Sequence, residues 1–428
     1  MRSFANSERY LARARRVIPL GSQTFSKSRT QFPLGVSPLF IQRASGSRVW
    51  DVDGNEYVDF VSSLAAVTLG YGDPDVTEAV RAQLDDGVIF TLPHPIEAEV
   101  AELIVELVPC AEMVRFGKNG SDATAGAIRL ARAFTGRDHV GVSGYHGWQD
   151  WYIGSTPRNR GVPEATRALT HSFPYGDLEA VERLFAARPG EMAALILEPM
   201  SLEWPEAGYL QALKDICHRE GALLIFDETI TGFRYSPGGA QQVLGVTPDL
   251  ACFGKGLANG YPLSAVAGRR DVMMLMEEIF FSFTFGGEAL SLAAAKATLA
   301  KLKREPVTEQ LAARGQLLLD RLPGLIAASG LDDVFAIKGH PSWTFLTIAD
   351  AAGTTSFQTK TLLLQELHQR GLLCIGTHNL SYAHSVQDIE DLLAGYGEIF
   401  PMIRDAVERG DIATRIRGET LVPLFKVR

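Results

Sequence analysis

Two residues of this chain, Asp227 and Lys255, have the types and positions needed for chemistry on a carbonyl group. Each follows a short apolar run, 222–226 for the aspartate and 250–253 for the lysine. A lysine amine beside glycines can form a Schiff base with an aldehyde, and a carboxylate can keep a pyridine nitrogen protonated. Pyridoxal phosphate requires both groups. The pair therefore predicts a site for an aldehyde cofactor of this kind.

A third candidate, Glu198, follows the apolar run 192–197 in the same way. In open α/β sheets, ligands bind beyond the carboxyl ends of the strands, where all three residues are expected. Taken singly, each has a structural explanation. Glu198 could cap a loop, Asp227 could cap the next helix, and Lys255 could be a solvated loop lysine. Three such residues at equivalent strand ends favour a shared site.

A nucleotide-binding loop is the alternative for a glycine-lysine pair. The Walker A pattern fails here, because Asp249 stands at its first glycine position and Gly256 at its Ser/Thr position. ATP chemistry is therefore disfavoured.

Two further segments could hold a flat, phosphorylated cofactor. The stretch 118–123 precedes a helix, so the backbone N–H groups of Gly120 and Ser121 would point at an anion on its N-terminus. The alternative is that Ser121 or the following aspartate is an ordinary N-cap. In the loop Tyr145-His146-Gly147 the aromatic ring could stack on a cofactor, or it could simply pack against the loop.

Strands and helices are expected to alternate through the middle of the chain. The apolar run 192–197, the amphipathic stretch 209–220 and the apolar run 222–226 form the βαβ pattern of a buried parallel sheet. Further strands are expected at 39–42, 48–52, 56–60, 250–253, 265–267, 344–348 and 372–375, and further helices at 96–108, 123–134, 290–302, 310–322, 361–369 and 388–399. The pattern predicts an α/β fold.

Composition restricts the class of protein. At 428 residues the chain is long enough for a large and a smaller domain, and its net charge of −9 disfavours nucleic acid as a partner. The four cysteines are dispersed without a C-x-x-C pair, and no apolar stretch is long enough to span a membrane. We expect a cytoplasmic protein that does not bind a membrane, and we assign no metal site.

Several motifs together resemble the class III pyridoxal-phosphate aminotransferases. The stretch 225–234 (IFDETITGFR), followed by Lys255, is similar to the family signature. The other matching motifs, in the family's order, are the glycine-serine pair at 120–121, the loop 145–147, Glu198-Pro199 and the stretch 283–287 (FTFGG). Within the class, the stretches 132–137 and 380–384 most resemble glutamate-1-semialdehyde 2,1-aminomutases.

This resemblance implies a fold-type I transferase, with a large, mostly parallel-sheet cofactor domain and a smaller α+β domain. The implied division is 1–55 for a segment that contributes to the small domain and the entrance of the site, 56–309 for the cofactor domain and 310–428 for the small domain. It also implies a homodimer with shared active sites.

The resemblance also implies a role for each matching residue. Lys255 would bind the cofactor aldehyde and shuttle the proton, and Asp227 would pair with the ring nitrogen. Tyr145 and Ile230 would lie on opposite faces of the ring. The remaining cofactor contacts would be Gly120 and Ser121 at the phosphate, with Thr284 of the partner subunit, and His146 and Glu198 near the ring.

The chain departs from the aminomutase pattern at three candidate substrate contacts. Lys27 stands where that family has a carboxylate-binding arginine, so a bidentate fork becomes a point charge. Glu203 stands in a shortened segment where the aminomutase has an asparagine, and no arginine occurs from 376 to 385 to pair with it. The segment 148–163 also looks shorter and carries Trp148 and Trp151, which could pack in the core or form a platform for a sugar ring.

Aminomutation requires an intermediate to stay bound while both amines exchange, which a closing gate would serve. The segment 148–163, which resembles such a gate, is altered here, and the arginine that would pair with Glu203 is missing. These two differences favour ordinary transamination from an amino acid, L-glutamate in our interpretation, to a carbonyl of a sugar or similar polar metabolite. The alternatives are aminomutation giving 5-aminolevulinate and, from a different class, a non-catalytic relative with a binding role.

Overall fold

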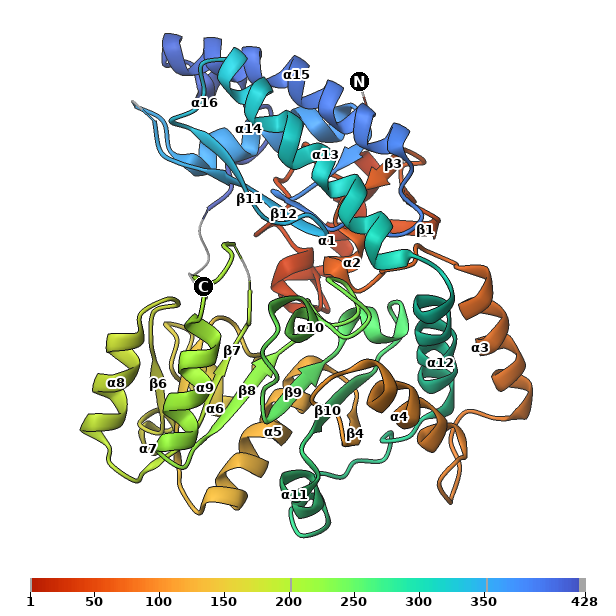
Figure 1. Cartoon of the computed structure of the whole chain (residues 1–428). Coiled ribbons are helices and arrows are strands. Elements are labelled where there is room, and N and C mark those ends of the chain that lie inside the picture. The colour runs from red at the N-terminus through yellow and green to blue at the C-terminus, as the bar shows by residue number, and fades with distance from the viewer. Residues whose placement is uncertain (1, 201, 352, 423–428) are drawn as a thin grey trace. The chain divides into compact units, whose positions relative to one another are not determined.

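The computed structural model describes residues 2–200, 202–351 and 353–422 (Figure 1). The chain divides into two compact units. Unit 1 holds the described residues of 1–73 and 309–424, and unit 2 those of 74–308. We describe each unit by itself.

Unit 2 is built on a seven-stranded sheet with the order β4-β10-β9-β8-β7-β5-β6. Its strands are β4 (Met113–Gly117), β5 (His139–Ser143), β6 (Thr170–Ser172), β7 (Met192–Leu197), β8 (Leu223–Asp227), β9 (Leu250–Phe253) and β10 (Ser264–Gly268). Only β10 runs against its neighbours, pairing antiparallel with both β4 and β9. The other six strands therefore present their carboxyl ends at one edge of the sheet.

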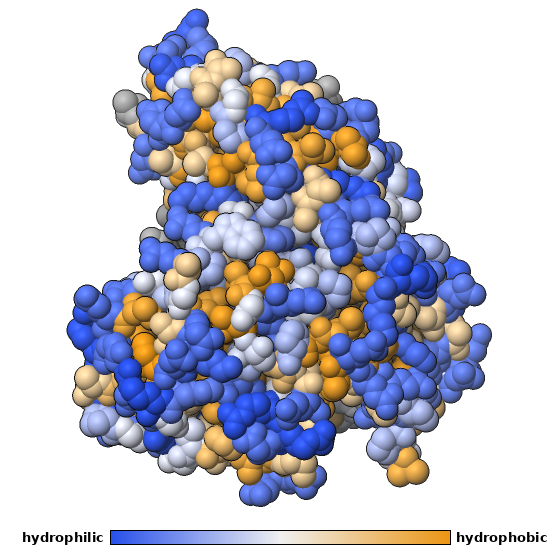
Figure 2. Space-filling model, viewed as in Figure 1, coloured by the Kyte–Doolittle hydropathy of each residue, from blue (hydrophilic) through white to orange (hydrophobic). Residues whose placement is uncertain are grey.

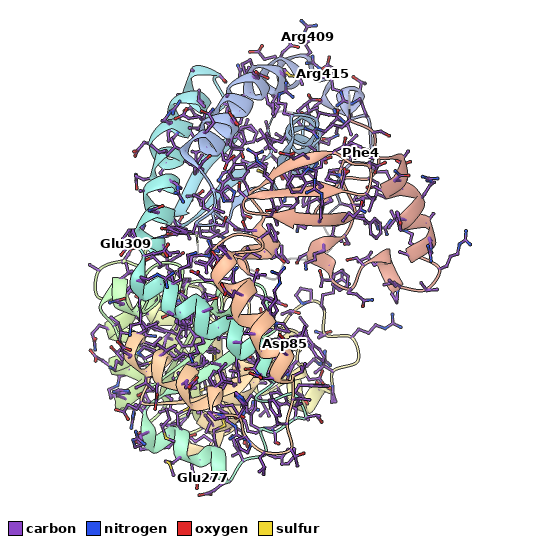
Figure 3. The ribbon with its side chains drawn as sticks, turned by 90° about the vertical axis from the view of Figure 1, so that its right-hand side faces the viewer. Phe4, Asp85, Glu277, Glu309, Arg409 and Arg415 are labelled. Atoms are coloured by element: carbon purple, nitrogen blue, oxygen red, sulfur yellow. The ribbon has the colours of Figure 1, made fainter. Side chains whose placement is uncertain are left out.

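Helices of unit 2 supply one hydrophobic core on each face of this sheet. They are α3 (Pro74–Asp86), α4 (Ile96–Leu107), α5 (Gly120–Thr135), α6 (Asp150–Ile153), α7 (Glu164–Arg167), α8 (Leu178–Ala187), α9 (Tyr209–Arg219), α10 (Ala240–Leu244), η3 (Lys255–Ala258), α11 (Arg270–Met273), η4 (Met274–Glu277) and α12 (Ala289–Arg304). One core joins α5 and α6 to the sheet, and the other joins α8 and α9 to it. Helices α3 and α12 lie side by side (Figures 1 and 3).

The two cores divide strand β7 between them. Ala194 and Ile196 belong to the core of α5, whereas Leu195 and Leu197 belong to the core of α8 and α9. Successive side chains of a strand point to opposite faces, so a strand covered on both faces must be apolar throughout. All six residues of β7 are buried, which explains the continuous apolar run in the sequence.

Unit 1 contains two smaller sheets, ordered β1-β2-β3-β13 and β11-β12-β14. The strands are β1 (Ile41–Ser45), β2 (Arg48–Asp51), β3 (Glu56–Asp59), β11 (Phe335–His340), β12 (Trp343–Ile348), β13 (Leu372–Leu373) and β14 (Thr377–His378). The helical elements are α1 (Ala5–Ala14), η1 (Pro19–Gly21), η2 (Phe25–Lys27), α2 (Ser62–Ala65), α13 (Val307–Ala328), α14 (Ser356–Gln369), α15 (Val386–Arg409) and α16 (Ile412–Arg415). Segments from both ends of the chain meet where β13 pairs with β3.

Most predicted elements are present, with boundaries shifted by a few residues. The α/β class and the antiparallel pairing of β1 with β2 and of β2 with β3 are confirmed. Strands β4, β5, β6, β11 and β14 were not predicted, because polar or glycine residues interrupt their apolar pattern. No helix among the described residues is both long and apolar enough to cross a membrane. Hydrophilic residues dominate the face shown in Figure 2, with apolar residues in scattered patches.

Leu195 tests the contribution of the sheet core to stability. Its side chain is fully buried, and a Cβ added at Gly141 on β5 would collide with it. We expect Leu195→Ala to lower the free energy of unfolding by about 2–5 kcal/mol, since it removes buried methyl groups and leaves a cavity. Urea unfolding followed by circular dichroism measures this change.

Leu84→Ala is the matched control, because Leu84 lies on α3 and is 55% exposed. Its effect should stay within about 0.5 kcal/mol. Equal losses in the two variants would contradict the assignment of Leu195 to a close-packed core.

Candidate active site

The carboxyl ends of five parallel strands place most of the predicted site residues at one edge of the sheet in unit 2. The segments that follow these strands carry Gly120 and Ser121 after β4, Tyr145 and His146 after β5, Glu198 after β7, Asp227 at the end of β8 and Lys255 after β9. Strands β9, β8, β7 and β5 are consecutive neighbours. The shared edge therefore brings the acidic, basic and aromatic candidates into one region.

Asp227 is a buried carboxylate held by neighbouring donors. One oxygen, Oδ2, lies 2.9 Å from Nδ1 of His146, and Oδ1 accepts a hydrogen bond of 3.1 Å from the backbone N–H of Thr229. Burial alone would raise the pKa of Asp227, but the hydrogen bond and charge of His146, with the backbone N–H of Thr229, hold it below its ordinary value. The carboxylate is therefore kept ionised while it is out of contact with solvent.

The ring of His146 is fixed by acceptors on both sides. Its Nε2 lies 3.1 Å from the carbonyl oxygen of Ser143, which can only accept, so Nε2 must donate. When Asp227 is ionised, Nδ1 must donate as well, and the ring then carries a positive charge. The ring is also stacked on Trp151, at a centroid separation of 6.5 Å. His146 therefore orients Asp227 and compensates its charge.

Lys255 begins η3, directly after Gly254. Its backbone φ is +41°, in the left-handed region that side chains other than glycine rarely adopt. Such conformations cost about 1–3 kcal/mol and occur preferentially at functional sites. The side chain is partly buried. The strained turn thus fixes the direction in which the amine leaves the end of β9.

The start of α5 has a different cap from either predicted one. Asn119 is the N-cap, and its side chain accepts from the backbone N–H of Asp122, whose carboxylate accepts from Asn119 N–H in return. Ser121 is not used for capping, and its hydroxyl instead accepts a hydrogen bond of 3.2 Å from Trp148 N–H. The first turn of α5 therefore remains suited to binding an anion.

Thr229 is a site residue that sequence analysis did not identify, although it lies within the signature stretch. Among the described residues, its hydroxyl is buried without a hydrogen-bond partner. A Cβ added at Gly120 would lie 2.9 Å from its methyl group, and one added at Gly254 would lie 3.2 Å from the same atom. An anion at the start of α5 would offer an acceptor beside this hydroxyl, so the donors present here fit a phosphate group.

Other predicted cofactor contacts lie close to this region. Oε2 of Glu198 accepts a hydrogen bond of 3.3 Å from Tyr145 N–H, which ties the end of β7 to the loop after β5. The ring of Tyr145 packs edge-on against Tyr152 at 5.7 Å. Ile230 is buried, three residues after Asp227. These contacts give the loop after β5 a defined position.

Most of the remaining candidates are exposed. Thr284 and Glu203 are exposed in loops of unit 2, and Lys27 is exposed at the end of η2 in unit 1. The two tryptophans differ: Trp151 is buried in the core of α5, whereas Trp148 is 66% exposed. The core-packing explanation is therefore confirmed for Trp151 and wrong for Trp148, while a substrate role for Trp148 stays a prediction.

Comparison with known proteins gives the family context of this site. The profile of the family described as "Aminotransferase class-III" matches residues 32–388. A glutamate-1-semialdehyde 2,1-aminomutase of Syntrophobacter fumaroxidans is 38% identical over 420 residues, covering 92% of this chain and 96% of the relative. A 3-aminobutyryl-CoA aminotransferase of Cloacimonas acidaminovorans is 32% identical, covering 91% and 97%.

Among solved structures, the FumI protein of Sphingopyxis sp. MTA144 in its PLP internal aldimine form has a TM-score of 0.87 and 30% identity. The alignment covers 94% of this chain and 97% of that one. This similarity and the family match confirm the predicted fold type and the expected pyridoxal phosphate cofactor.

The charge of Asp227 is open to a direct test. We expect Asp227→Asn to slow amino transfer by on the order of 100-fold or more, because a neutral amide cannot hold a proton on the cofactor ring. Protein loaded with pyridoxal phosphate is mixed with the amino substrate, and the loss of the visible absorption band is followed in a stopped-flow instrument.

Glu206→Gln, at an exposed carboxylate of unit 2, is the control and should react like the unchanged protein. An Asp227→Asn variant that reacts at the full rate would show that this carboxylate does not serve the cofactor.

Proposed function

The chain belongs to the class III aminotransferase family, and from that premise we propose that it is an aminomutase converting glutamate-1-semialdehyde into 5-aminolevulinate. The observation that carries this proposal is the near full-length similarity, at 38% identity, to a protein of that name. Intramolecular amino transfer was the alternative in the sequence analysis, and the relatives support it better than transfer to a sugar carbonyl. Relatives with names for both kinds of reaction occur at similar identity.

Pyridoxal phosphate, when bound, supplies an aldehyde that takes up amines and a ring that withdraws electrons from the adjacent carbon. Asp227 would hold a proton on the ring nitrogen, with His146 keeping that carboxylate ionised. Gly120 and Ser121 would bind the phosphate through their backbone N–H groups. Tyr145 and Ile230 would confine the ring from its two faces.

Lys255 would have two successive tasks in this site. Its Nζ would first hold the cofactor covalently and, once displaced by the substrate amine, would carry a proton between substrate and cofactor carbons. The strained backbone at Lys255 supports this role, since it fixes the position of the amine. Glu198, tied to the loop after β5, would line the same site.

Transfer between two substrates is the second candidate, and Lys27 favours it. The family's arginine is a lysine here, and the side chain is exposed in this structure. A lysine cannot reproduce the bidentate grip on a substrate carboxylate. In this reaction L-glutamate would donate the amino group to a sugar or similar polar carbonyl compound, with Trp148 and Glu203 near the acceptor. The similarity to a 3-aminobutyryl-CoA aminotransferase supports intermolecular transfer in general.

A homodimer with shared active sites is part of the proposal. Two segments of unit 2 expose apolar side chains, and they are adjacent because Ala289 N–H donates to Val88 O at 2.8 Å. The exposed side chains are Val88, Ile89, Phe90, Leu92, Phe280, Phe283 and Phe285. An apolar surface of this kind marks an interaction site. Thr284 lies in the middle of the second segment, where it would reach the phosphate of the partner subunit.

The domain roles and the location of the protein also remain proposals. Residues 56–309 would hold the cofactor, apart from 56–73, which lie in unit 1, and 1–55 with 310–428 would form the smaller domain and the entrance of the site. The four cysteines, all described, are buried and form no disulfide, which supports a reducing, cytoplasmic setting.

Product analysis separates the two reactions. The protein loaded with pyridoxal phosphate is incubated with glutamate-1-semialdehyde alone, and separately with L-glutamate alone. We expect 5-aminolevulinate from the first mixture in many-fold excess over enzyme, and no stoichiometric 2-oxoglutarate from the second. Release of 2-oxoglutarate equal to the enzyme, without 5-aminolevulinate formation, would select transamination instead. Lys255→Ala is the blank for both mixtures.

Mixed dimers test whether Thr284 acts across the subunit boundary. Lys255→Ala and Thr284→Asp should each inactivate the homodimer, the second because a carboxylate repels phosphate. In a mixed dimer of the two, one site would carry both changes and the other neither, so activity should return to about half per dimer. Differently tagged subunits are co-expressed, and the mixed species is purified and assayed. An inactive mixed dimer would place Thr284 in its own subunit's site.

A further inference from the structure

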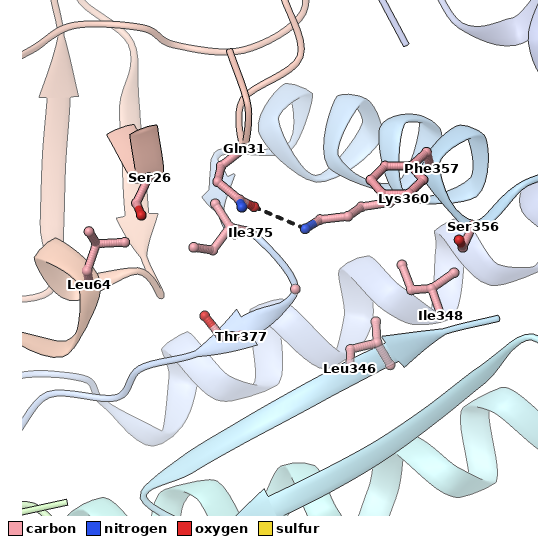
Figure 4. A pocket seen from close by; sticks show the side chains of 11 residues that line it. Ser26, Gln31, Leu64, Leu346, Ile348, Ser356, Phe357, Lys360, Ile375 and Thr377 are labelled. Carbon is pink, nitrogen blue, oxygen red and sulfur yellow. Dashed lines mark hydrogen bonds between the residues drawn. The ribbon is translucent and has the colours of Figure 1, made fainter. Parts of the chain in front are cut away.

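Unit 1 contains a pocket of about 420 Å³ that is formed by segments distant in the sequence (Figure 4). Helix α14 contributes Phe357 and Lys360 to its wall, and strand β12 contributes Leu346 and Ile348. The segment that follows η2 contributes Gln31. All of the lining residues belong to unit 1, so the pocket is defined within that unit alone.

Lys360 extends its side chain into this pocket. Its Nζ donates a hydrogen bond of 3.2 Å to Oε1 of Gln31, drawn as a dashed line in Figure 4. Gly376 lies beside the lysine stem, since a Cβ added there would be in ordinary van der Waals contact with Cε of Lys360, at 3.7 Å. The ammonium group is thus held at a defined place.

The charge of Lys360 is not balanced by the pocket. Among the described lining residues it is the only charged one, and its hydrogen-bond partner is a neutral amide. Burial lowers the pKa of Lys360 to about 8, because the charged form has lost water without gaining an anion. An anionic ligand would supply the missing partner.

The start of α14 lies at the pocket. Thr355 is the N-cap and forms a capping box with Gln358, so the helix begins at the pocket wall, where Ser356 and Phe357 line it. The N-terminus of a helix favours negative charge within its first turn. Ser356 N–H already donates to Oδ1 of Asp350 at 2.6 Å, which meets this preference, so the case for an anion in the pocket rests on the ammonium group of Lys360.

The other walls of the pocket combine apolar side chains with the hydroxyl groups of Ser26, Ser356 and Thr377. Leu64, Leu346, Ile348 and Ile375 surround the space around the ammonium group. A carboxylate on a short aliphatic chain matches the single cation, the hydroxyl groups and the apolar side chains of this lining.

We propose that this pocket binds the carboxylate of a short aliphatic acid, with Nζ of Lys360 as the ion-pair partner. The assignment differs from the sequence prediction, which gave a carboxylate-binding role to Lys27. Lys27 is exposed and is not among the described lining residues. The proposal goes beyond the proposed function, because it holds whether amino transfer is intramolecular or occurs between two substrates.

Calorimetric titration of the protein loaded with pyridoxal phosphate tests the proposal with pentanoate as the probe. Pentanamide, which has the same shape without the charge, is the matched ligand. We expect pentanoate to bind one site per chain and pentanamide to bind at least about 10-fold more weakly, as expected for loss of an ion pair with a desolvated lysine.

Three variants locate the binding site. Lys360→Met should weaken pentanoate binding at least about 10-fold, whereas Lys360→Arg, which keeps the charge, should retain it to within about 5-fold. Lys27→Met should leave binding unchanged. Equal binding of the acid and the amide, or a loss in Lys27→Met and not in Lys360→Met, would overturn the proposal.

A second measurement avoids dependence on the folding of Lys360→Met. Lysines of the unchanged protein are reductively methylated with ¹³C, and the Lys360 signal is assigned as the one missing from Lys360→Arg. Pentanoate, but not pentanamide, should shift this signal. An unmoved signal at saturating pentanoate would also overturn the proposal.

Inhibition kinetics distinguish the two sources of such a carboxylate. Pentanoate that competes with the amino substrate would show that the pocket takes the substrate's own carboxylate. Inhibition or activation at saturating substrate would show a separate effector. Either effect of pentanoate supports the proposed binding site if Lys360→Met abolishes that effect. An effect of the same size in Lys360→Met would contradict the proposal.

Discussion

The ion pair between Asp227 and His146 is the interaction on which the electrostatics of the candidate site depend. A carboxylate buried in an apolar setting would ordinarily take up a proton and become neutral. Here the imidazole at 2.9 Å keeps the charge in place, and the carbonyl of Ser143 keeps the imidazole in place. The two strands that carry this arrangement, β5 and β8, both pair with β7. Sheet geometry therefore determines an electrostatic property of the site.

The same edge of the sheet supplies the other groups that a phosphorylated aldehyde needs. An amine follows β9 at Lys255, backbone donors follow β4 at the start of α5, and an aromatic ring follows β5 at Tyr145. None of these groups is unusual alone. Their combination arises because parallel strands deliver every following loop to one side of the sheet. The family match and the similar solved structures agree with this architecture.

Part of this arrangement could be predicted, because some strands leave a signal within a short stretch of sequence. Continuous apolar runs reveal strands covered on both faces, so β7, β8 and β9 and the polar residues after them were found. Strand β5 is interrupted by Gly141 and was missed, although its register with β7 is what places His146. The pairing of His146 with Asp227 spans 81 residues, and no local pattern predicts it.

The environment of Lys360 could not be predicted from the sequence either. On an amphipathic helix a lysine is most simply interpreted as solvated, and only the packing of α14 near β12 and Gln31 encloses it. Lys27, in contrast, was assigned a role in binding the substrate carboxylate because of its position in a motif, but its side chain is exposed. Burial, which decides how a charge behaves, is a tertiary property.

The division of β7 between two cores has a consequence for how the protein can change. The core of α5 contains Trp151, which stacks on His146, and Tyr145 packs against it. The core of α8 and α9 contains none of the candidate cofactor contacts. Substitutions on one side of the sheet can thus alter the reaction, while those on the other act mainly on folding. A single layer of backbone thus separates residues whose substitution would change stability alone from residues whose substitution would also disturb the candidate site.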